Sequence, residues 1–161
     1  MTLVTTFIGL VGYVFAVSAQ LSPADVQKRL VGNYRLVRFV NIDEQGVERP
    51  AAYEAGRIMY DAHGQMAAQL SRSGREKLSP MPSEAERATA YGGFLAYYGR
   101  YTIDAANSRV THHVEGSTNP NWPGTDLVRY YAFSPDDSRL MLSLKNAEGR
   151  ITGTLTWERI R

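Results

Sequence analysis

The C-terminal part of the chain repeats one pattern that leaves room for little besides antiparallel strands. From residue 100 onward, turn-like clusters rich in Gly, Pro, Asn, Asp and Ser separate short segments that alternate apolar and polar residues. Such lengths and β-branched content are typical of strands rather than helices. The clusters are DAANS, TNPNWPG, SPDDS and KNAEG, and the strands expected between them are 100–103, 109–115, 126–133, 139–144 and 151–161.

The N-terminal half adds further strands and two helices. The run GNYRLVRFVNI alternates as a strand does, and short strands are expected at 57–60 and 65–70, joined by a tight turn at 61–64. Ser22 and Pro23 are typical of the start of a helix, predicted over 23–30. Ser83 with Glu86 forms a capping box that predicts a second helix, ending near Gly99.

Together these elements predict a mainly β fold of about eight antiparallel strands, with a short N-terminal helix and one inserted helix. Short strands at regular spacing favour an up-and-down barrel or a sandwich. A barrel of eight strands is just wide enough to hold side chains or one small ligand.

Composition excludes several classes of function. The 161 residues suffice for one domain with a sizeable core. The 18 basic and 16 acidic side chains are interspersed, so nucleic acid is a poor candidate partner. With no cysteine, the chain has no disulfide framework, thiolate zinc site, cysteine nucleophile or lipid anchor on cysteine.

The first 19 residues differ from the rest of the chain. They carry no charged side chain, and Val17, Ser18 and Ala19 put small residues at the positions expected for cleavage before Gln20. The apolar stretch is short for a membrane span, which needs roughly 20 residues. We therefore predict a signal peptide over 1–19, a domain over 20–161, no stable membrane span after cleavage, and a secreted or periplasmic protein.

Six stretches of the chain resemble the lipocalin-like domain family, whose members are small bacterial and fungal proteins. The resemblance covers nearly the whole mature chain and implies a calycin-type β-barrel with a central cavity. Such barrels serve as carriers and, in a few cases, as isomerases or cyclases. The stretches are LVGNYRL (30–36), GQMAAQL (64–70), YYGRY (97–101), VTHHVE (110–115), NPNWPGT (119–125) and TWER (156–159).

One residue departs from the broader lipocalin pattern, in which a Gly-x-Trp opens the first strand and an arginine near the last strand stacks on the tryptophan. Here Gly32-Asn33-Tyr34 supplies tyrosine instead. The resemblance implies that Arg159 stacks on Tyr34 across the base of the barrel, a contact worth about 0.5–2 kcal/mol.

Unusual polar and aromatic residues gather between Gly99 and Phe133. Because alternate residues of a strand share a face, His113 and Glu115 point together and His112 points the other way. The sequence leaves open which histidine faces the cavity. The residues expected to contact a ligand are Arg100, His112, His113, Glu115, Asn121, Trp122, Arg129 and Tyr131.

These polar residues allow four interpretations. A metal site lacks a third converging ligand, because His112 lies on the opposite face and His63 lies in a distant turn. His113 beside Glu115 suits proton transfer on a carbonyl-bearing ligand. Alternatively, these side chains pair across strands on the outer face, or they anchor a bound ligand. Trp122, in a proline-stiffened loop, is expected to cover the cavity or to fill the end of the core.

No glycine-flanked serine elbow and no phosphate-binding glycine loop occurs in the sequence, and no cofactor is expected. The leading hypothesis is a binding protein that holds a small, largely apolar molecule in the barrel through a few polar anchors. The alternative is an isomerase or cyclase that uses His113 and Glu115 as catalytic acid and base.

Overall fold

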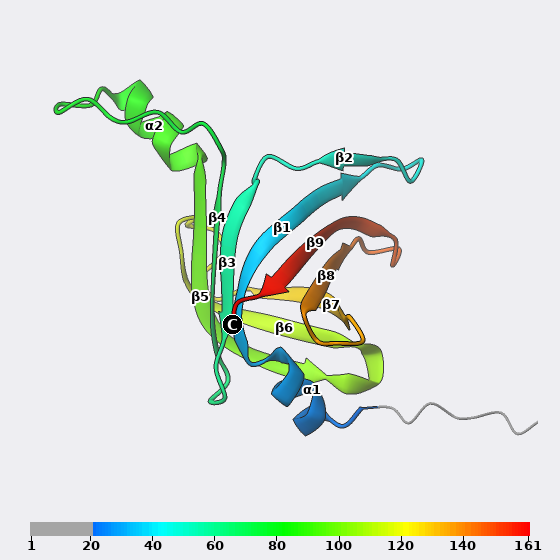
Figure 1. Ribbon diagram of the computed structural model, residues 1–161. Helices are drawn as coiled ribbons and strands as arrows, with labels where there is room; N and C mark the ends of the chain where they lie inside the picture. Colours follow the sequence, from blue (N-terminus) through cyan, green and yellow to red (C-terminus); the bar gives the residue numbers. More distant parts are fainter. Residues whose placement is uncertain (1–20) are drawn as a thin grey trace, which may run out of the picture.

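The computed structural model describes residues 21–161 and shows a closed antiparallel β-barrel (Figure 1). Eight strands run in the order β1-β3-β4-β5-β6-β7-β8-β9, and β1 pairs with β9 to close the barrel. A further short strand, β2, pairs with the outer part of β1. The mainly β barrel expected from the sequence is confirmed. The strands are β1 Gly32–Ile42, β2 Glu48–Pro50, β3 Ala55–Tyr60, β4 Gln65–Ser71, β5 Phe94–Asp104, β6 Arg109–Ser117, β7 Asp126–Phe133, β8 Arg139–Lys145 and β9 Ile151–Arg159.

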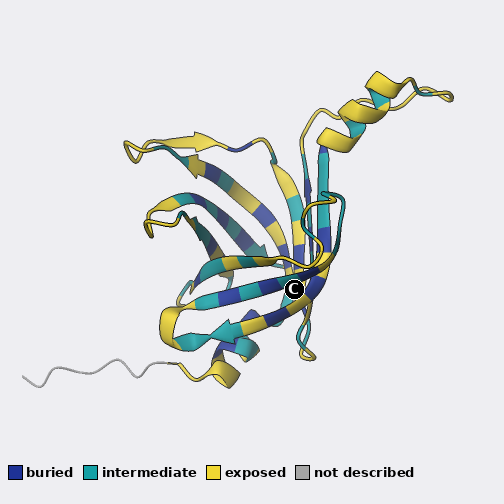
Figure 2. Cartoon of the chain, turned by 180° about the vertical axis from the view of Figure 1, so that it is seen from behind, coloured by how far each residue is buried: buried dark blue, intermediate teal, exposed yellow. Residues whose placement is uncertain are grey.

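Strand alternation divides the side chains between the barrel interior and the solvent. On β8, Leu140 and Leu142 are buried, whereas Met141 between them is exposed. Figure 2 shows the same alternation of buried and exposed residues along the neighbouring strands. Most buried residues form one core, because each of the eight barrel strands contributes its inward row to the same interior.

Helix α1 (Pro23–Leu30) covers one end of the barrel, beside the start of β1 (Figure 1). Ser22 caps the helix by accepting a hydrogen bond from the backbone N–H of Asp25. Val26 and Leu30 are fully buried, so this helix seals the core at this end.

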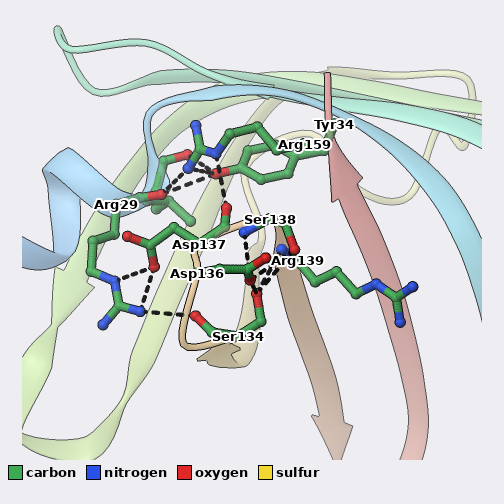
Figure 3. Close-up of polar contacts among 9 residues, drawn as sticks. Arg29, Tyr34, Ser134, Asp136, Asp137, Ser138, Arg139 and Arg159 are labelled. Carbon is green, nitrogen blue, oxygen red and sulfur yellow. Dashed lines mark hydrogen bonds and ion pairs between the residues drawn. The ribbon is translucent and has the colours of Figure 1, made fainter. Parts of the chain in front are cut away.

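Tyr34 and Arg159 contact each other at the end of the barrel that α1 covers, here called the closed end, as the resemblance implied. The Arg159 guanidinium lies over the Tyr34 ring at 4.7 Å from its centre, which confirms the expected stacking. Its nitrogens also donate to the Tyr34 hydroxyl at 2.5 Å and to the carbonyl oxygens of Arg29, Val31 and Asp137 (Figure 3). One arginine therefore ties α1, the first strand and the turn between β7 and β8 together.

The turn between β7 and β8 contributes a second set of contacts to the closed end (Figure 3). Asp137 pairs with Arg29 of α1, and Arg29 also stacks over the Phe133 ring at 4.5 Å from its centre. Asp136 accepts hydrogen bonds from both Ser134 and Ser138, and these bonds hold the turn. Hydrogen bonds, an ion pair and a stacked arginine therefore connect α1 to the β7–β8 turn at this end.

The inserted helix is shorter than the sequence predicted. Helix α2 spans Glu84–Gly92 and begins with the expected capping box of Ser83 and Glu86. The expected end near Gly99 is wrong, because β5 begins at Phe94 and pairs with β4 from Phe94 to Arg100. Gly92 and Gly93 disfavour continuation of the helix. Beyond them, pairing with β4 outweighs the helical spacing of the aromatic residues. No residue of α2 is buried, and Figures 1 and 2 show it away from the barrel wall.

Two further points concern an additional strand and the N-terminal segment. Strand β2 was not predicted, since its residues Glu48–Pro50 are all exposed and lack an apolar alternation. The expected signal peptide, residues 1–19, lies outside the described residues. Within residues 21–161, no helix has the length and apolar character needed to cross a membrane.

Candidate functional site: a cavity inside the barrel

A cavity of about 310 Å³ lies inside the barrel, on the side away from α1. Helix α1 lies next to the first residues of β1. The cavity is lined by Phe39, near the other end of β1, and by Leu155, which pairs with Phe39 in β9. Side chains from seven strands and two loops enclose it. The lining residues are Phe39, Tyr53, Ile58, Ala68, Leu70, Leu95, Tyr97, Trp122, Leu127, Arg129, Leu142, Leu144, Leu155 and Trp157.

The lining is apolar and aromatic apart from a few polar groups. Arg129 is its only charged residue, and no acidic residue takes part. Tyr97 and Trp122 pack edge to face, with ring centres 5.5 Å apart, and so form one aromatic corner of the cavity. Cavities that bind small molecules typically combine such walls with a few placed polar groups.

Behind Tyr97, a buried histidine links two tyrosines. His112 is fully buried, and its Nε2 lies 2.7 Å from the Tyr60 hydroxyl while its Nδ1 lies 3.0 Å from the Tyr97 hydroxyl. The three residues come from β3, β5 and β6, which places the row across the barrel. Tyr97 is the member that lines the cavity, so the row connects the cavity to the core.

Burial and the charge of Arg129 set the protonation states of this row. Burial lowers the pKa of His112 well below its usual value, and the positive charge of Arg129 lowers it further. Burial raises the pKa of Tyr60 and of Tyr97, whereas the Arg129 charge opposes the rise in both. At neutral pH the row therefore holds a neutral imidazole between two neutral hydroxyls.

Trp157 carries a buried polar atom without a partner. Its side chain is 1% exposed, it lines the cavity, and its Nε1–H has no hydrogen bond to any described residue. An unpaired buried donor costs about 1–3 kcal/mol. Native proteins rarely keep such a donor without a reason.

Three of the residues predicted for the site lie on the outer face of the barrel. His113 contacts Asp126 at 2.6 Å through Nδ1 and Thr102 at 2.9 Å through Nε2, whereas Glu115 pairs with Arg100 at 3.2 Å. None of them lines the cavity. The expected acid–base pairing of His113 with Glu115 inside the barrel is therefore not formed, because the inward row of β6 contains Val110, His112 and Val114 instead.

The other predicted residues divide between the cavity and the rest of the barrel. Trp122 and Arg129 line the cavity, and His112 contacts its wall through Tyr97. Asn121 is exposed in the loop after β6. Tyr131 packs against Phe133 outside the cavity lining, with ring centres 5.4 Å apart. No cluster of three or more potential metal ligands occurs in the described part of the chain.

Sequence reasoning missed Tyr97 and Trp157 as cavity residues. Helical spacing predicts Tyr97 in the inserted helix, whereas its strand register opposite Ala68 puts it in the barrel wall. The signal available was alternation: Leu95, Tyr97 and Gly99 follow the period of a strand. The sequence identifies Trp157 only as part of the TWER motif. Its inward position follows from the alternation of Leu155, Trp157 and Arg159.

The chain is similar to known proteins in sequence and, more distantly, in structure. A family model described as a lipocalin-like domain matches residues 31–160. The 4'-hydroxy-3'-methoxypropiophenone carrier protein of Aspergillus oryzae is 35% identical over 111 residues, which cover 59% of this chain and 96% of that protein. Among solved structures, a redesigned β-barrel matches with a TM-score of 0.43 and 10% identity, over 84% of this chain and 95% of the other.

Proposed function

Because the chain belongs to the lipocalin-like domain family, we propose that it is a carrier that holds one small, largely apolar molecule inside its barrel. The cavity of about 310 Å³ carries this proposal, since its lining includes a single charged residue, Arg129. The volume lies at the lower end of the range of about 300–1,000 Å³ that is usual for small-molecule sites. The proposed ligand is correspondingly small.

An aromatic ligand fits the lining best. Phe39, Tyr53, Tyr97 and Trp122 offer ring faces and edges to the cavity, and aromatic rings pack favourably against one another in offset or edge-to-face geometry. The relative from Aspergillus oryzae is named as a carrier of an aromatic ketone with hydroxyl and methoxy groups. Its name supports the proposal that this chain takes a ligand of a similar class.

The isomerase or cyclase alternative needs an acid and a base that face the ligand. His113 and Glu115, the residues expected for these roles, lie outside the cavity. No acidic residue lines the cavity, so the lining offers no carboxylate that could replace Glu115 in this role. A carrier is therefore the function that we propose.

We also propose that the carrier acts outside the cytoplasm. The support is the uncharged N-terminal segment and the small residues before Gln20. Expression in the native host followed by N-terminal sequencing tests this part. A mature protein that begins at Gln20 would support export, whereas a protein that retains Met1 in the cytoplasm would overturn it.

Filling the cavity tests the carrier proposal directly. Leu142→Trp adds bulk inside the cavity, whereas Met141→Trp adds the same bulk on the outer face of the same strand. With 4'-hydroxy-3'-methoxypropiophenone as the probe, native mass spectrometry should detect a one-to-one complex for the wild type and for Met141→Trp. Leu142→Trp should weaken binding by about tenfold or more, equal to about 1.4 kcal/mol. Equal binding by both variants would contradict the proposal. So would a wild type that binds neither this ketone nor the bicyclic aromatic probes 2-naphthamide and 2-naphthoate.

A further inference from the structure

We propose that the cavity selects ligands that present a negatively charged oxygen, which the Arg129 guanidinium and the Tyr97 hydroxyl bind together. The inference rests on the proposed function, since it assigns the chemistry of one end of the ligand that the same cavity takes. Three observations support it: the missing counter-ion of Arg129, the hydrogen-bond arrangement around His112, and the absence of acidic residues from the lining.

Arg129 brings a positive charge to the cavity without an acidic partner. None of the ion pairs among the described residues includes it, and it donates a hydrogen bond to the carbonyl oxygen of the neighbouring Val128, at 2.9 Å. Arg129 is half-buried, and a charge that is partly withdrawn from water beside apolar walls is stabilised by a paired counter-ion. The planar guanidinium suits a carboxylate or a phenolate, and a ligand with such a group would supply the missing partner.

The bonds around His112 determine which hydroxyl has a proton to offer. A neutral imidazole has one N–H donor and one acceptor nitrogen. The Tyr60 hydroxyl is buried, and its one hydrogen bond within the described chain is to Nε2 of His112. If Nε2 carried the proton, the Tyr60 proton would have no acceptor. The favoured arrangement is therefore that Tyr60 donates to Nε2 and Nδ1–H donates to the Tyr97 oxygen.

This arrangement leaves the Tyr97 proton unused inside the protein. Tyr97 lines the cavity and packs there against Trp122, and the proposal assigns its O–H to an oxygen of the ligand. The Arg129 charge lies near enough to oppose the burial-induced rise in the pKa of Tyr97 and to act on His112 behind it. A hydroxyl donor and a cationic donor thus lie together on one part of the wall, an arrangement that stabilises an anionic oxygen.

The rest of the lining restricts the ligand to one kind of anion. Because no acidic residue lines the cavity, nothing repels a carboxylate or a phenolate there. Leucines and aromatic rings surround the remaining space, so a bulky inorganic anion gains no apolar contact. The chemical class that fits is a small aromatic acid, or a phenol that ionises on binding.

A matched pair of probes separates charge from shape. 2-Naphthoate and 2-naphthamide share size and ring system, but only the first is an anion. Isothermal titration should show that the wild type binds 2-naphthoate at least about tenfold more tightly, because hydrogen bonds to an ionised group are roughly twice as strong as neutral ones. Arg129→Gln should bring the two affinities within about twofold, and Arg129→Lys should keep a preference for the anion. Arg100→Gln, on the outer face, should behave as the wild type.

The outcomes distinguish the two proposals. Equal affinity of the wild type for both probes, or an unchanged preference in Arg129→Gln, would overturn the anion selectivity and leave the carrier proposal standing. Failure of the wild type to bind either probe would overturn both. Tyr97→Phe gives a second test. This variant should bind 2-naphthoate several-fold more weakly than the wild type, and its loss of affinity for 2-naphthamide should be smaller. An equal loss for the two probes would contradict the role of the hydroxyl.

The tautomer of His112 can be read without any ligand. Nitrogen-15 correlation spectra of the imidazole should show the proton on Nδ1 and none on Nε2 in the wild type. The opposite tautomer would place the free proton on Tyr60 rather than on Tyr97 and would overturn the proposed donor pair.

Discussion

Protonation of His112 should destabilise the fold as the pH falls, because the buried imidazole between two tyrosine hydroxyls has no counter-ion. Burial and Arg129 hold its folded-state pKa well below 6.5, whereas in the unfolded chain it titrates near 6.5. The unfolded state therefore binds more protons than the folded state in this window. The contribution of His112 to stability is fully present above pH 6.5 and is lost progressively below it.

The magnitude follows from linkage of one proton. Each pH unit below the unfolded pKa costs about 1.4 kcal/mol for one group. Between about pH 7.5 and about pH 5, the free energy of unfolding should therefore fall by about 2 kcal/mol on account of His112 alone. The carboxyl groups of Glu86, Asp104 and Asp136, whose pKa values are lowered to about 2, lose their contribution mainly at more acidic pH, below the usual carboxyl range.

Urea unfolding, followed by tryptophan fluorescence across this pH range, measures the loss. His112→Gln should lower stability at neutral pH and should remove about 2 kcal/mol of the pH dependence. His113→Gln, on the outer face, keeps His112 and should keep the slope that His112 produces. An identical pH dependence in wild type and His112→Gln would refute the reasoning. So would an imidazole of His112 that titrates near pH 6.5 in the folded wild type, as read by NMR.

Further predictions concern the closed end and the barrel wall. Arg159→Met should lower the free energy of unfolding by about 3 kcal/mol, because it leaves partly buried carbonyl oxygens and the Tyr34 hydroxyl without their donor. The matched variant Arg161→Met should change stability by less than about 0.5 kcal/mol, and equal losses would argue against this role. Gly99→Ala should cost about 1–3 kcal/mol in urea unfolding, since its Cβ would overlap the carbonyl oxygen of His113. Gly92→Ala meets nothing within 4 Å and should be neutral or stabilising by up to about 1 kcal/mol; a similar cost at both glycines would contradict the argument.

Much of the barrel could be predicted from the sequence because its strands alternate and its turns carry Gly, Pro, Asn and Asp. Residues 139–144 illustrate this, since their strand was expected and β8 spans Arg139–Lys145. The stacking of Arg159 on Tyr34 also followed from a motif. The stretch Phe94–Gly99 could not be assigned in the same way, because its aromatic residues fit helical spacing as well. Its pairing with β4, a non-local contact, decides its conformation.

The candidate site was predictable only in part. Trp122 and Arg129 were expected near the ligand, and both line the cavity. The choice between His112 and His113 was open, because alternation separates two neighbouring residues without saying which face is inside. That choice depends on the register of β6 against β5 and β7, which pairs His112 with Tyr101 and with Leu127.

The indole N–H of Trp157 offers the most direct test of a ligand inside this barrel. The chain contains two tryptophans, and both line the cavity, so two indole signals report on it. Trp122→Phe and Trp157→Phe assign the signals in a nitrogen-15 correlation spectrum. Titration with 2-naphthoate should shift both indole signals with one common saturation curve. Leu142→Trp should move this curve to at least about tenfold higher ligand concentration, whereas Met141→Trp should keep the wild-type curve. Saturable binding that leaves both signals in place would show that the ligand sits elsewhere and would contradict the account.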